Sequence, residues 1–145
     1  MDLLTQDAAD LAEDARRLLL ELDRDVPGVA SVSAECRPPV DVIETASSVV
    51  VVIDIPGVAA ESVRVAVRRS TLLIVGAKLA PLPDGGARFH VAERAYGRFA
   101  RAVRLAGAFD AARARASTFA GQLRVELPRL DDRRGRVLPI TVERG

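Results

Sequence analysis

The side chains that most often perform catalysis are scarce in this sequence and lie outside any catalytic motif. The chain of 145 residues holds one histidine, His90, and one cysteine, Cys36. Together with Asp54 or Glu93 they could be imagined as a nucleophilic site, but no glycine elbow or nucleophile motif frames them. One histidine and one cysteine are also too few for a transition-metal cluster or an internal disulfide. We therefore predict no catalytic residue, no metal site and no enzyme activity, and we interpret His90 as a partly exposed strand residue within a loop.

A nucleotide cofactor is not expected, because the usual phosphate-binding motif is missing. Lys78 is the single lysine, and it follows Ala77 where a Gly-Lys-Ser/Thr loop would have glycine. The sequence therefore predicts that the protein works without ATP, and it indicates no other cofactor.

Charge is distributed unevenly along the chain. Residues 1–35 hold nine acids and three arginines, a net charge of −6, whereas residues 36–145 hold eighteen bases and eleven acids, a net charge of +7. Opposite charges attract, so we expect the two parts to associate. The basic part raises the alternative of nucleic-acid binding, but strand alternation splits Arg98, Arg101 and Arg104 between two faces, and nearby aromatic side chains are too few for a stacking platform. We predict no nucleic-acid partner and interpret the arginines mostly as solvated surface.

The elements that would position any functional residue begin with an amphipathic helix over roughly residues 3–24. Its small and aliphatic residues recur at spacings of 4, 3, 4, 3 and 4 and form one stripe: Leu4, Ala8, Leu11, Ala15, Leu18 and Leu22. Acids lie toward its start and arginines toward its end, which suits the helix dipole, and Pro27-Gly28 ends it. Two interpretations remain open. The stripe packs on the protein's own domain, or it pairs with another chain or covers the apolar patch of an unfolded client.

Beyond the double proline Pro38-Pro39, the hydrophobic period becomes the period of two that is typical of strands. Residues that share a face recur in five segments: Val49, Val51, Ile53 and Ile55; Val63, Val65 and Val67; Leu72 and Ile74; Phe99, Arg101, Val103 and Leu105; Leu123, Val125 and Leu127. Short strands at close intervals, without long helices between them, predict an all-β fold, an immunoglobulin-like antiparallel β-sandwich. The sequence shows no export signal and no stretch that would span a membrane, so we expect a cytoplasmic protein without a membrane partner.

Two segments break the rhythm of the strands. The stretch from Ala77 to Ala95 is too long for a hairpin turn, and Arg88–Arg94 within it is expected to form a short strand reaching away from the parent sheet. After Pro128 the chain is charged and then ends in the apolar patch Val137–Val142. This tail is interpreted as a solvated tether followed by an apolar plug.

Several of these motifs resemble, in the correct order, those of the small heat shock proteins and their α-crystallin domain. The segments Val40–Glu44 and Val52–Val58 are similar to the opening strands of the family and its Leu-Pro-Gly-Val-type turn. The most specific match is to the family's Ala-x-x-x-Asn-Gly-x-Leu signature, of which Ala116, Gly121 and Leu123 supply three of four named positions. The resemblance covers about residues 38–142.

Two positions depart from the family pattern. Ala106 stands where the family usually has proline, and Ala120 stands where it usually has asparagine. Both lie at expected turns, so they bear on the details of those turns and not on the fold. The arm before Pro38 also lacks the aromatic residues that many relatives use to bind clients.

The resemblance implies a division of the chain and a function. The division is an arm over residues 1–38 with the amphipathic helix, an α-crystallin domain over residues 39–128 and a flexible C-terminal extension over residues 129–145. The function is that of a holdase of the stress response, a chaperone that binds partly unfolded proteins without ATP, works as an exchangeable oligomer of dimers and prevents aggregation. The residues of the arm that would bind clients are Leu4, Leu11, Leu18 and Leu22.

The resemblance also implies how copies of the chain would assemble. In bacterial and plant relatives a strand of the long loop crosses to the partner's sheet, and by position this strand would be Arg88–Arg94. The residues implied at the loop and the dimer interface are Arg88, Phe89, His90, Glu93, Arg94, Tyr96, Gly97 and Arg101. Leu138-Pro139-Ile140 resembles the C-terminal Ile-x-Ile motif, which docks in a groove of a neighbouring dimer. The alternative for this tripeptide is a last strand of the protein's own sandwich.

A closer alternative keeps the sandwich and changes the role. The chain would then be a dedicated adaptor or assembly factor for one aggregation-prone partner. The arm without aromatic residues and the heptad-like helix favour this alternative, whereas the C-terminal plug argues against the related co-chaperone sandwiches, which lack it.

Overall fold

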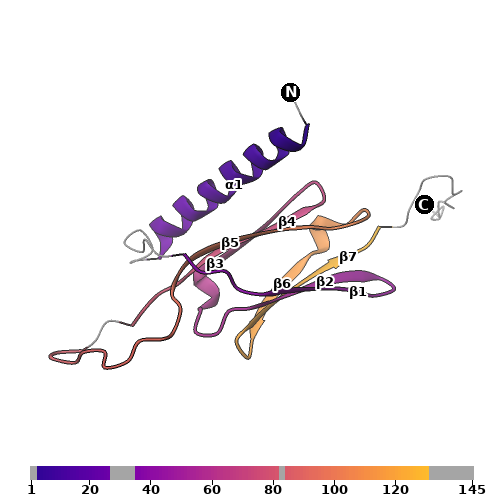
Figure 1. The fold of residues 1–145 in the computed structure, drawn as a ribbon. Helices are drawn as coiled ribbons and strands as arrows, with labels where there is room; N and C mark the ends of the chain where they lie inside the picture. Colours follow the sequence, from indigo (N-terminus) through magenta and orange to yellow (C-terminus); the bar gives the residue numbers. More distant parts are fainter. Residues whose placement is uncertain (1–2, 27–34, 82–83, 131–145) are drawn as a thin grey trace, which may run out of the picture.

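The computed structural model describes residues 3–26, 35–81 and 84–130, and side chains from Ala9 onward. Its elements, in chain order, are α1 (Leu3–Asp25), β1 (Val40–Glu44), β2 (Ser48–Asp54), the 3-10 turn η1 (Ala60–Ser62), β3 (Val63–Arg68), β4 (Thr71–Lys78), β5 (Gly97–Arg104), the 3-10 turn η2 (Ala111–Arg113), β6 (Arg115–Phe119) and β7 (Gln122–Pro128). The strands form two antiparallel sheets, ordered β1-β2-β7-β6 and β3-β4-β5, which pack face to face around one core (Figure 1). The predicted antiparallel β-sandwich with an N-terminal helix is confirmed.

The core between the sheets is almost entirely aliphatic. Its members come from the faces that alternation predicts, and Val51, Ile53 and Ile74 are completely buried in it. Phe99 is the one buried aromatic side chain of the described residues, with 3% of its surface exposed. Arg101 shares the inward side of β5 with Phe99 but is only half-buried. A core built from branched aliphatic side chains explains why so few aromatic residues suffice.

Gly76 makes room for the single core aromatic ring. A Cβ atom at this position would collide with Phe99 Cζ and lie 2.7 Å from the backbone oxygen of Ser62. Real Cβ atoms do not approach other atoms this closely, so a side chain at position 76 would force the ring or the backbone to move. Glycine at this point of β4 is therefore a packing requirement.

The β6–β7 hairpin closes through a two-residue turn at Ala120 and Gly121. Both residues have positive φ, 52° and 78°, which is the backbone geometry of a type I′ turn. A Cβ atom at Gly121 would lie 3.4 Å from Pro56, and the Gly121 carbonyl accepts a hydrogen bond from the Ile55 amide at 2.8 Å. The family signature therefore coincides with a left-handed turn, in which Ala120 is the unfavourable residue type.

Helix α1 lies across the outer face of the three-stranded sheet, over β3 and β4 (Figure 1). Leu22 is completely buried and packs with Ala77 of β4. Leu73 and Val75 alternate with the core residues of β4 and so lie on its outer side, yet they are only 3% and 0% exposed. Strand β4 is thus buried on both faces. Of the two interpretations of the helix, the structure shows the one in which it packs on its own domain.

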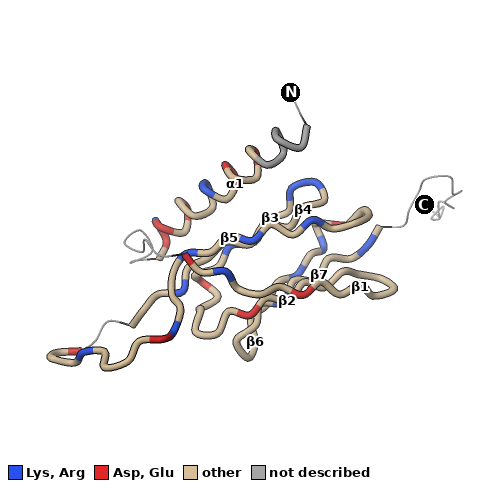
Figure 2. Tube along the Cα trace, viewed as in Figure 1, with Lys and Arg blue, Asp and Glu red and all other residues tan. Residues whose placement is uncertain are grey.

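Ion pairs join one edge of α1 to β3. Arg64 pairs with Asp25 at 2.9 Å, and Arg68 pairs with Asp14 at 2.6 Å and with Asp10 at 3.5 Å. Figure 2 shows acidic positions along the helix and basic positions on the strands beneath it. The attraction expected between the acidic and the basic part of the chain is confirmed. In the described part of the chain, no helix has the length and the apolar composition that crossing a membrane requires.

The chain between β4 and β5 projects from one end of the sandwich (Figure 1). We call residues 79–95 the protruding segment; of these, the structure describes 79–81 and 84–95. The strand predicted for Arg88–Arg94 is absent from the single chain, because no neighbouring strand pairs with this stretch. At the base of the segment the Tyr96 ring contacts two cations, with the Arg94 guanidinium 5.2 Å and the Lys78 ammonium 5.9 Å from its centre. These contacts fix where the segment leaves the sandwich.

Candidate interaction surfaces

The side chains with catalytic potential do not form a constellation. His90 is exposed on the protruding segment, whereas Cys36 is half-buried beside β5 and its thiol donates a hydrogen bond to the Gly97 carbonyl at 3.5 Å. Burial raises the pKa of the Cys36 thiol, against a smaller opposing influence of Lys78. A thiol with a raised pKa stays protonated near neutral pH and is a poor nucleophile. Among the residues that the structure describes, no three histidine, cysteine or acidic side chains are placed to hold a metal ion.

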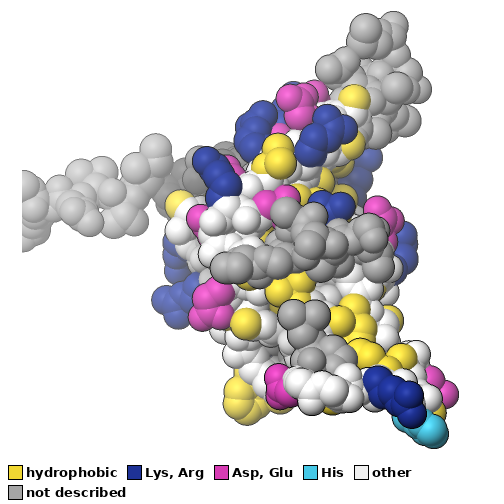
Figure 3. All heavy atoms as spheres, turned by 90° about the vertical axis from the view of Figure 1, so that its left-hand side faces the viewer, with side chains coloured by type: hydrophobic (Ala, Val, Ile, Leu, Met, Phe, Trp, Pro, Cys, Tyr) yellow, Lys and Arg dark blue, Asp and Glu magenta, His cyan; other side chains and the backbone are white. Residues whose placement is uncertain are grey.

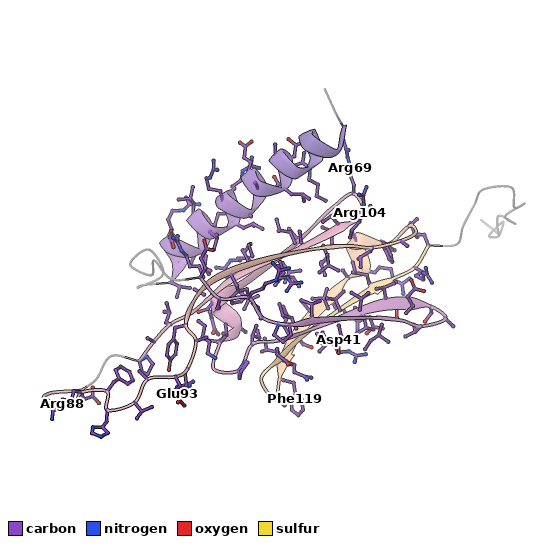
Figure 4. The ribbon with its side chains drawn as sticks, viewed as in Figure 1. Asp41, Arg69, Arg88, Glu93, Arg104 and Phe119 are labelled. Carbon is purple, nitrogen blue, oxygen red and sulfur yellow. The ribbon has the colours of Figure 1, made fainter. Side chains whose placement is uncertain are left out.

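The protruding segment carries exposed apolar side chains. Phe89 is 54% exposed and Val91 is 69% exposed, and the two have the spacing of residues on one face of an extended strand. Arg88 lies far out on the segment and Glu93 lies nearer to its base (Figure 4), and apolar side chains gather near this end of the molecule in the space-filling view (Figure 3). The predicted residues Arg88, Phe89, His90, Glu93 and Arg94 are thus all exposed to solvent.

Strand β1 is one of the two edges of the four-stranded sheet, and β6 is the other. Among the described residues, β1 pairs with β2 alone, from Val40 opposite Ile53 to Glu44 opposite Val49. Val42 and Ile43 on this edge are 48% and 47% exposed. An unpaired strand edge with apolar side chains is a template for another strand. The part of the chain that the structure describes therefore contains both an extended segment that pairs with no strand and a strand edge that pairs with no neighbour.

The edge of β5 on the same side of the sandwich is covered by the end of the N-terminal arm. Glu35 forms a parallel bridge with Arg98, and the Cys36 amide donates a hydrogen bond to the Arg98 carbonyl at 3.0 Å. Arg101 reaches across the same gap, where its Nη1 donates to the Pro38 carbonyl at 3.0 Å. Arg101 thus ties this part of the chain to β5, and Gly97 at the start of the same strand is buried.

The other open side of the sandwich, between the edge strands β3 and β6, carries an apolar groove. The groove has a volume of about 310 Å³. Its lining consists largely of small and branched aliphatic side chains: Val65, Ala66, Val67, Leu72, Ala111, Ala114, Ala116 and Val125, with Arg115 at the rim. Aliphatic side chains of another segment could enter it without leaving a polar group unpaired.

Comparison with known proteins assigns this arrangement to a family. The model of the Hsp20/alpha crystallin family matches residues 41–142. The chain belongs to the Hsp20/α-crystallin family. An 18.9 kDa heat shock protein of Oryza sativa subsp. japonica is 37% identical over 101 residues, which are 68% of this chain and 57% of the rice protein. The chain thus matches little more than half the length of this relative.

Solved structures of Hsp20 proteins have the same fold. Heat shock protein 16.0 of Schizosaccharomyces pombe is 28% identical, with a TM-score of 0.61 over 74% of this chain and 99% of the yeast chain. A small heat-shock protein of Xylella fastidiosa is 27% identical, with a TM-score of 0.63 over 77% of this chain and 99% of its own. The resemblance to small heat shock proteins noted in the sequence is confirmed.

The Hsp20 signature residues serve the β6–β7 hairpin and the groove. Ala116 lies on β6 and lines the groove, Gly121 forms the left-handed turn, and Leu123 of β7 is 3% exposed in the core. The plug residues Leu138, Pro139 and Ile140 lie outside the described residues. Their role therefore stays a prediction, although the groove that could receive aliphatic side chains is present.

The four leucines predicted to bind clients do not form an exposed stripe in this Hsp20 chain. Leu22 is completely buried against β4, Leu11 and Leu18 are half-buried, and the side chain of Leu4 is outside the described part. Among the described side chains of the helix, the large hydrophobic one that is exposed is instead Leu20, at 57%. Client binding through the predicted stripe would require the helix to leave the sheet.

Sequence reasoning missed the outer face of β4. It assigned Leu72 and Ile74 to the core but gave no role to Leu73, Val75 and Ala77, which are buried beneath α1. The available signal was the apolar run from Leu72 to Ala77, because a strand buried on both faces does not alternate.

Proposed function

We propose that this Hsp20 chain is an ATP-independent holdase that binds partly unfolded proteins and keeps them from aggregating. Family membership supports a chaperone role, and the observation that carries the finer proposal is the set of apolar surfaces on one fold. Unfolding proteins expose aliphatic side chains and unpaired strand edges. An unpaired edge at β1 and an apolar groove between β3 and β6 match these two features, because one can form strand hydrogen bonds and the other can bury aliphatic side chains. Clients would reach both surfaces while subunits exchange, when neither the segment of a partner nor a plug occupies them. A single cysteine suits the reducing cytoplasm, where we place the protein.

Dimers are proposed to form by exchange of the protruding segment. Residues 88–94 of one protomer would add to the β1 edge of its partner and become the strand that the single chain lacks. The support is the pairing of two incomplete features, since Phe89 and Val91 on the segment and Val42 and Ile43 on the edge are all exposed. Strand addition would supply backbone hydrogen bonds and bury these side chains together.

Higher assembly is proposed to use the C-terminal extension, which we take to begin at residue 129. Leu138 and Ile140 would insert into the β3–β6 groove of a neighbouring dimer, with Pro139 holding the backbone between them extended. Burying each side chain is worth about 1.5–3 kcal/mol before the ordering of the tether is subtracted. Single plugs are therefore weak, and several acting together would give oligomers whose subunits still exchange.

The holdase proposal is tested by heating clients in the presence of the full-length protein. We expect light scattering from several unrelated heat-labile proteins to stay low at a stoichiometric ratio and without nucleotide. Bovine serum albumin at equal mass is the control for nonspecific crowding. Unprotected precipitation of every client would contradict the proposal.

A second candidate function is service to one partner as a dedicated adaptor. The observation that favours it is that helix α1 packs its apolar stripe on the protein's own sheet, so the stripe is not displayed to unfolding proteins in general. Protection of a single client among many in the same heating experiment would support the adaptor over the general holdase.

A further inference from the structure

The outer face of the three-stranded sheet, which we call the outer face, combines an apolar row with basic edges. Cross-strand pairing places Ala66, Leu73 and Ala102 in one row and Arg64, Val75 and Ala100 in the next. Directly paired residues of antiparallel strands point to the same side of the sheet. The centre of the face is therefore aliphatic, and arginines border it on both outer strands: Arg64 and Arg68 on β3, Arg98 and Arg104 on β5.

Helix α1 shows which chemistry this face accepts. It packs Leu22 against Ala77 of the same face and directs Asp25 and Asp14 to the arginines of β3, at 2.9 and 2.6 Å. The bound segment is thus an amphipathic one, with aliphatic side chains along one stripe and carboxylates beside it. None of these contacts requires the helix to belong to the same chain, because they are side-chain contacts across a surface.

Two features weaken the binding of α1 to the outer face. Asp25 is 61% exposed in its ion pair, and exposed pairs contribute little to stability. One carboxylate oxygen of Asp23 is buried without a hydrogen-bond partner among the described residues, which penalises the docked state. Undocking would return this oxygen to water. The unpaired Asp23 oxygen therefore lowers the stability of the docked helix. A different bound segment, without a carboxylate at that place, would not have this free-energy cost.

The helix also covers only part of the outer face. It packs over β4 and β3, and a groove of about 610 Å³ remains open between the helix and β5. Ala15 and Leu19 of the helix line this groove together with Ala100, and Arg98 stands at the β5 side. Arg104 lies at the far end of the face, near the β3–β4 turn that carries Arg69 (Figure 4). The acids Asp23 and Glu35 also line the groove. An incoming segment would therefore meet apolar, basic and acidic contacts there, and it would reach the full row of arginines on β3 only after the helix leaves.

We propose that the outer face is a client-binding surface, selective for unfolding segments with an aliphatic stripe flanked by carboxylates, and that α1 occupies it as an internal competitor. This inference rests on the proposed holdase role and names the chemistry of the clients that one surface takes. Strongly basic amphipathic segments would be rejected, because their cations would meet the arginines of the face.

Two full-length variants separate the face from the helix that covers it. Asp10→Asn/Asp14→Asn/Asp25→Asn breaks the ion pairs from the helix side and leaves the arginines in place. Arg64→Gln/Arg68→Gln breaks the same pairs from the sheet side and removes part of the basic border. Both variants loosen α1, but only the first keeps the complete binding surface. All five side chains are at least partly exposed, so the sandwich is expected to fold, which far-ultraviolet circular dichroism checks.

The probe is a fluorescein-labelled synthetic 23-residue peptide, unrelated in sequence to α1 but with its pattern of aliphatic and acidic positions. Fluorescence anisotropy at low salt is expected to show at least tenfold tighter binding by the aspartate variant than by the wild type. The arginine variant is expected to bind no more tightly than the wild type. A peptide with lysines at the acidic positions should not bind either variant. Equal affinity of the two variants, or no gain for the aspartate variant, would overturn the inference.

Two further results keep this inference distinct from related ideas. A peptide with the α1 sequence is tested in parallel, and binding of that peptide alone would show helix exchange between copies instead of client selection, which also overturns the inference. Aggregation of heated clients is measured with the same three proteins. Protection of clients without peptide binding would support the holdase proposal and contradict the proposal that the outer face binds clients. Peptide binding without protection would support the outer face as a binding surface and contradict the holdase proposal.

Discussion

Ala120 occupies a backbone conformation that suits few residue types. Its φ of 52° lies in the left-handed region, where alanine is disfavoured and asparagine is tolerated. The Ala-x-x-x-Asn-Gly-x-Leu signature that this hairpin resembles has asparagine at this position. The type I′ turn is therefore formed here in spite of its first residue, and the fold absorbs the cost.

The substitution Ala120→Asn is expected to stabilise the protein by about 1 kcal/mol, because it relieves the left-handed alanine. The measurement is the denaturant midpoint of unfolding, followed by circular dichroism. Thr118→Asn places the same residue type at an exposed position of β6 in the same hairpin, and it should leave the midpoint unchanged or lower it. A lower midpoint for Ala120→Asn would show that the turn is not strained.

Gly76 should tolerate no side chain. We expect Gly76→Ala to destabilise the sandwich by about 1–3 kcal/mol, because the new methyl group would overlap the Phe99 ring and crowd the Ser62 carbonyl. Gly85→Ala on the protruding segment is the matched control, since nothing lies within 4 Å of a Cβ atom there. Similar thermal unfolding of the two variants would contradict this account of Gly76.

At the scale of elements, the proposed pairing of the protruding segment with the β1 edge predicts that the dimer depends on this segment. Deletion of residues 84–93 is expected to leave monomers in analytical ultracentrifugation, because the strand that would cross to the partner is gone. The sandwich itself should remain, since none of its described strands includes these residues.

A milder change tests the same exchange without shortening the chain. Phe89→Ser/Val91→Ser should weaken the dimer by at least tenfold, because the side chains that would pack on the partner's edge lose their apolar surface. Leu20→Ser on α1 removes an exposed leucine elsewhere and should leave the dimer unchanged. A dimer that survives both the deletion and the double substitution would rule out segment exchange.

Alternation was enough to predict the strand faces of the core in β3, β5 and β7, because charged residues lie on the opposite side of each of these strands. It failed for β4, where the side expected to be free is buried under α1 and no polar residue marks it. The opposite charges of the two parts of the chain predicted that ion pairs would join them. They did not predict which helix carboxylates would pair with Arg64 and Arg68. The strand at Arg88–Arg94 could not form in one chain, since strand hydrogen bonds need a neighbour.

At the scale of the whole molecule, assembly is expected to depend on the plug. Leu138→Ala/Ile140→Ala should shrink the oligomer while the sandwich keeps its unfolding temperature, because these residues contact a neighbouring dimer in the proposal. Light scattering after size-exclusion chromatography measures the mass. Val137→Ala/Val142→Ala is the control for loss of apolar surface in the same tail. An unchanged mass for the first pair would favour a last strand on the protein's own sandwich.

The order of strands in the larger sheet has a consequence for folding during synthesis on the ribosome. Strand β2 pairs with β7 from Ser48 opposite Pro128 to Asp54 opposite Gln122, so its second neighbour is among the last parts of the sandwich to leave the ribosome. The sheet β3-β4-β5 needs no later segment and can form earlier. A nascent chain halted before β6 would therefore display the bare side of β2, and this protein would briefly need the kind of protection that we propose it gives to unfolding proteins.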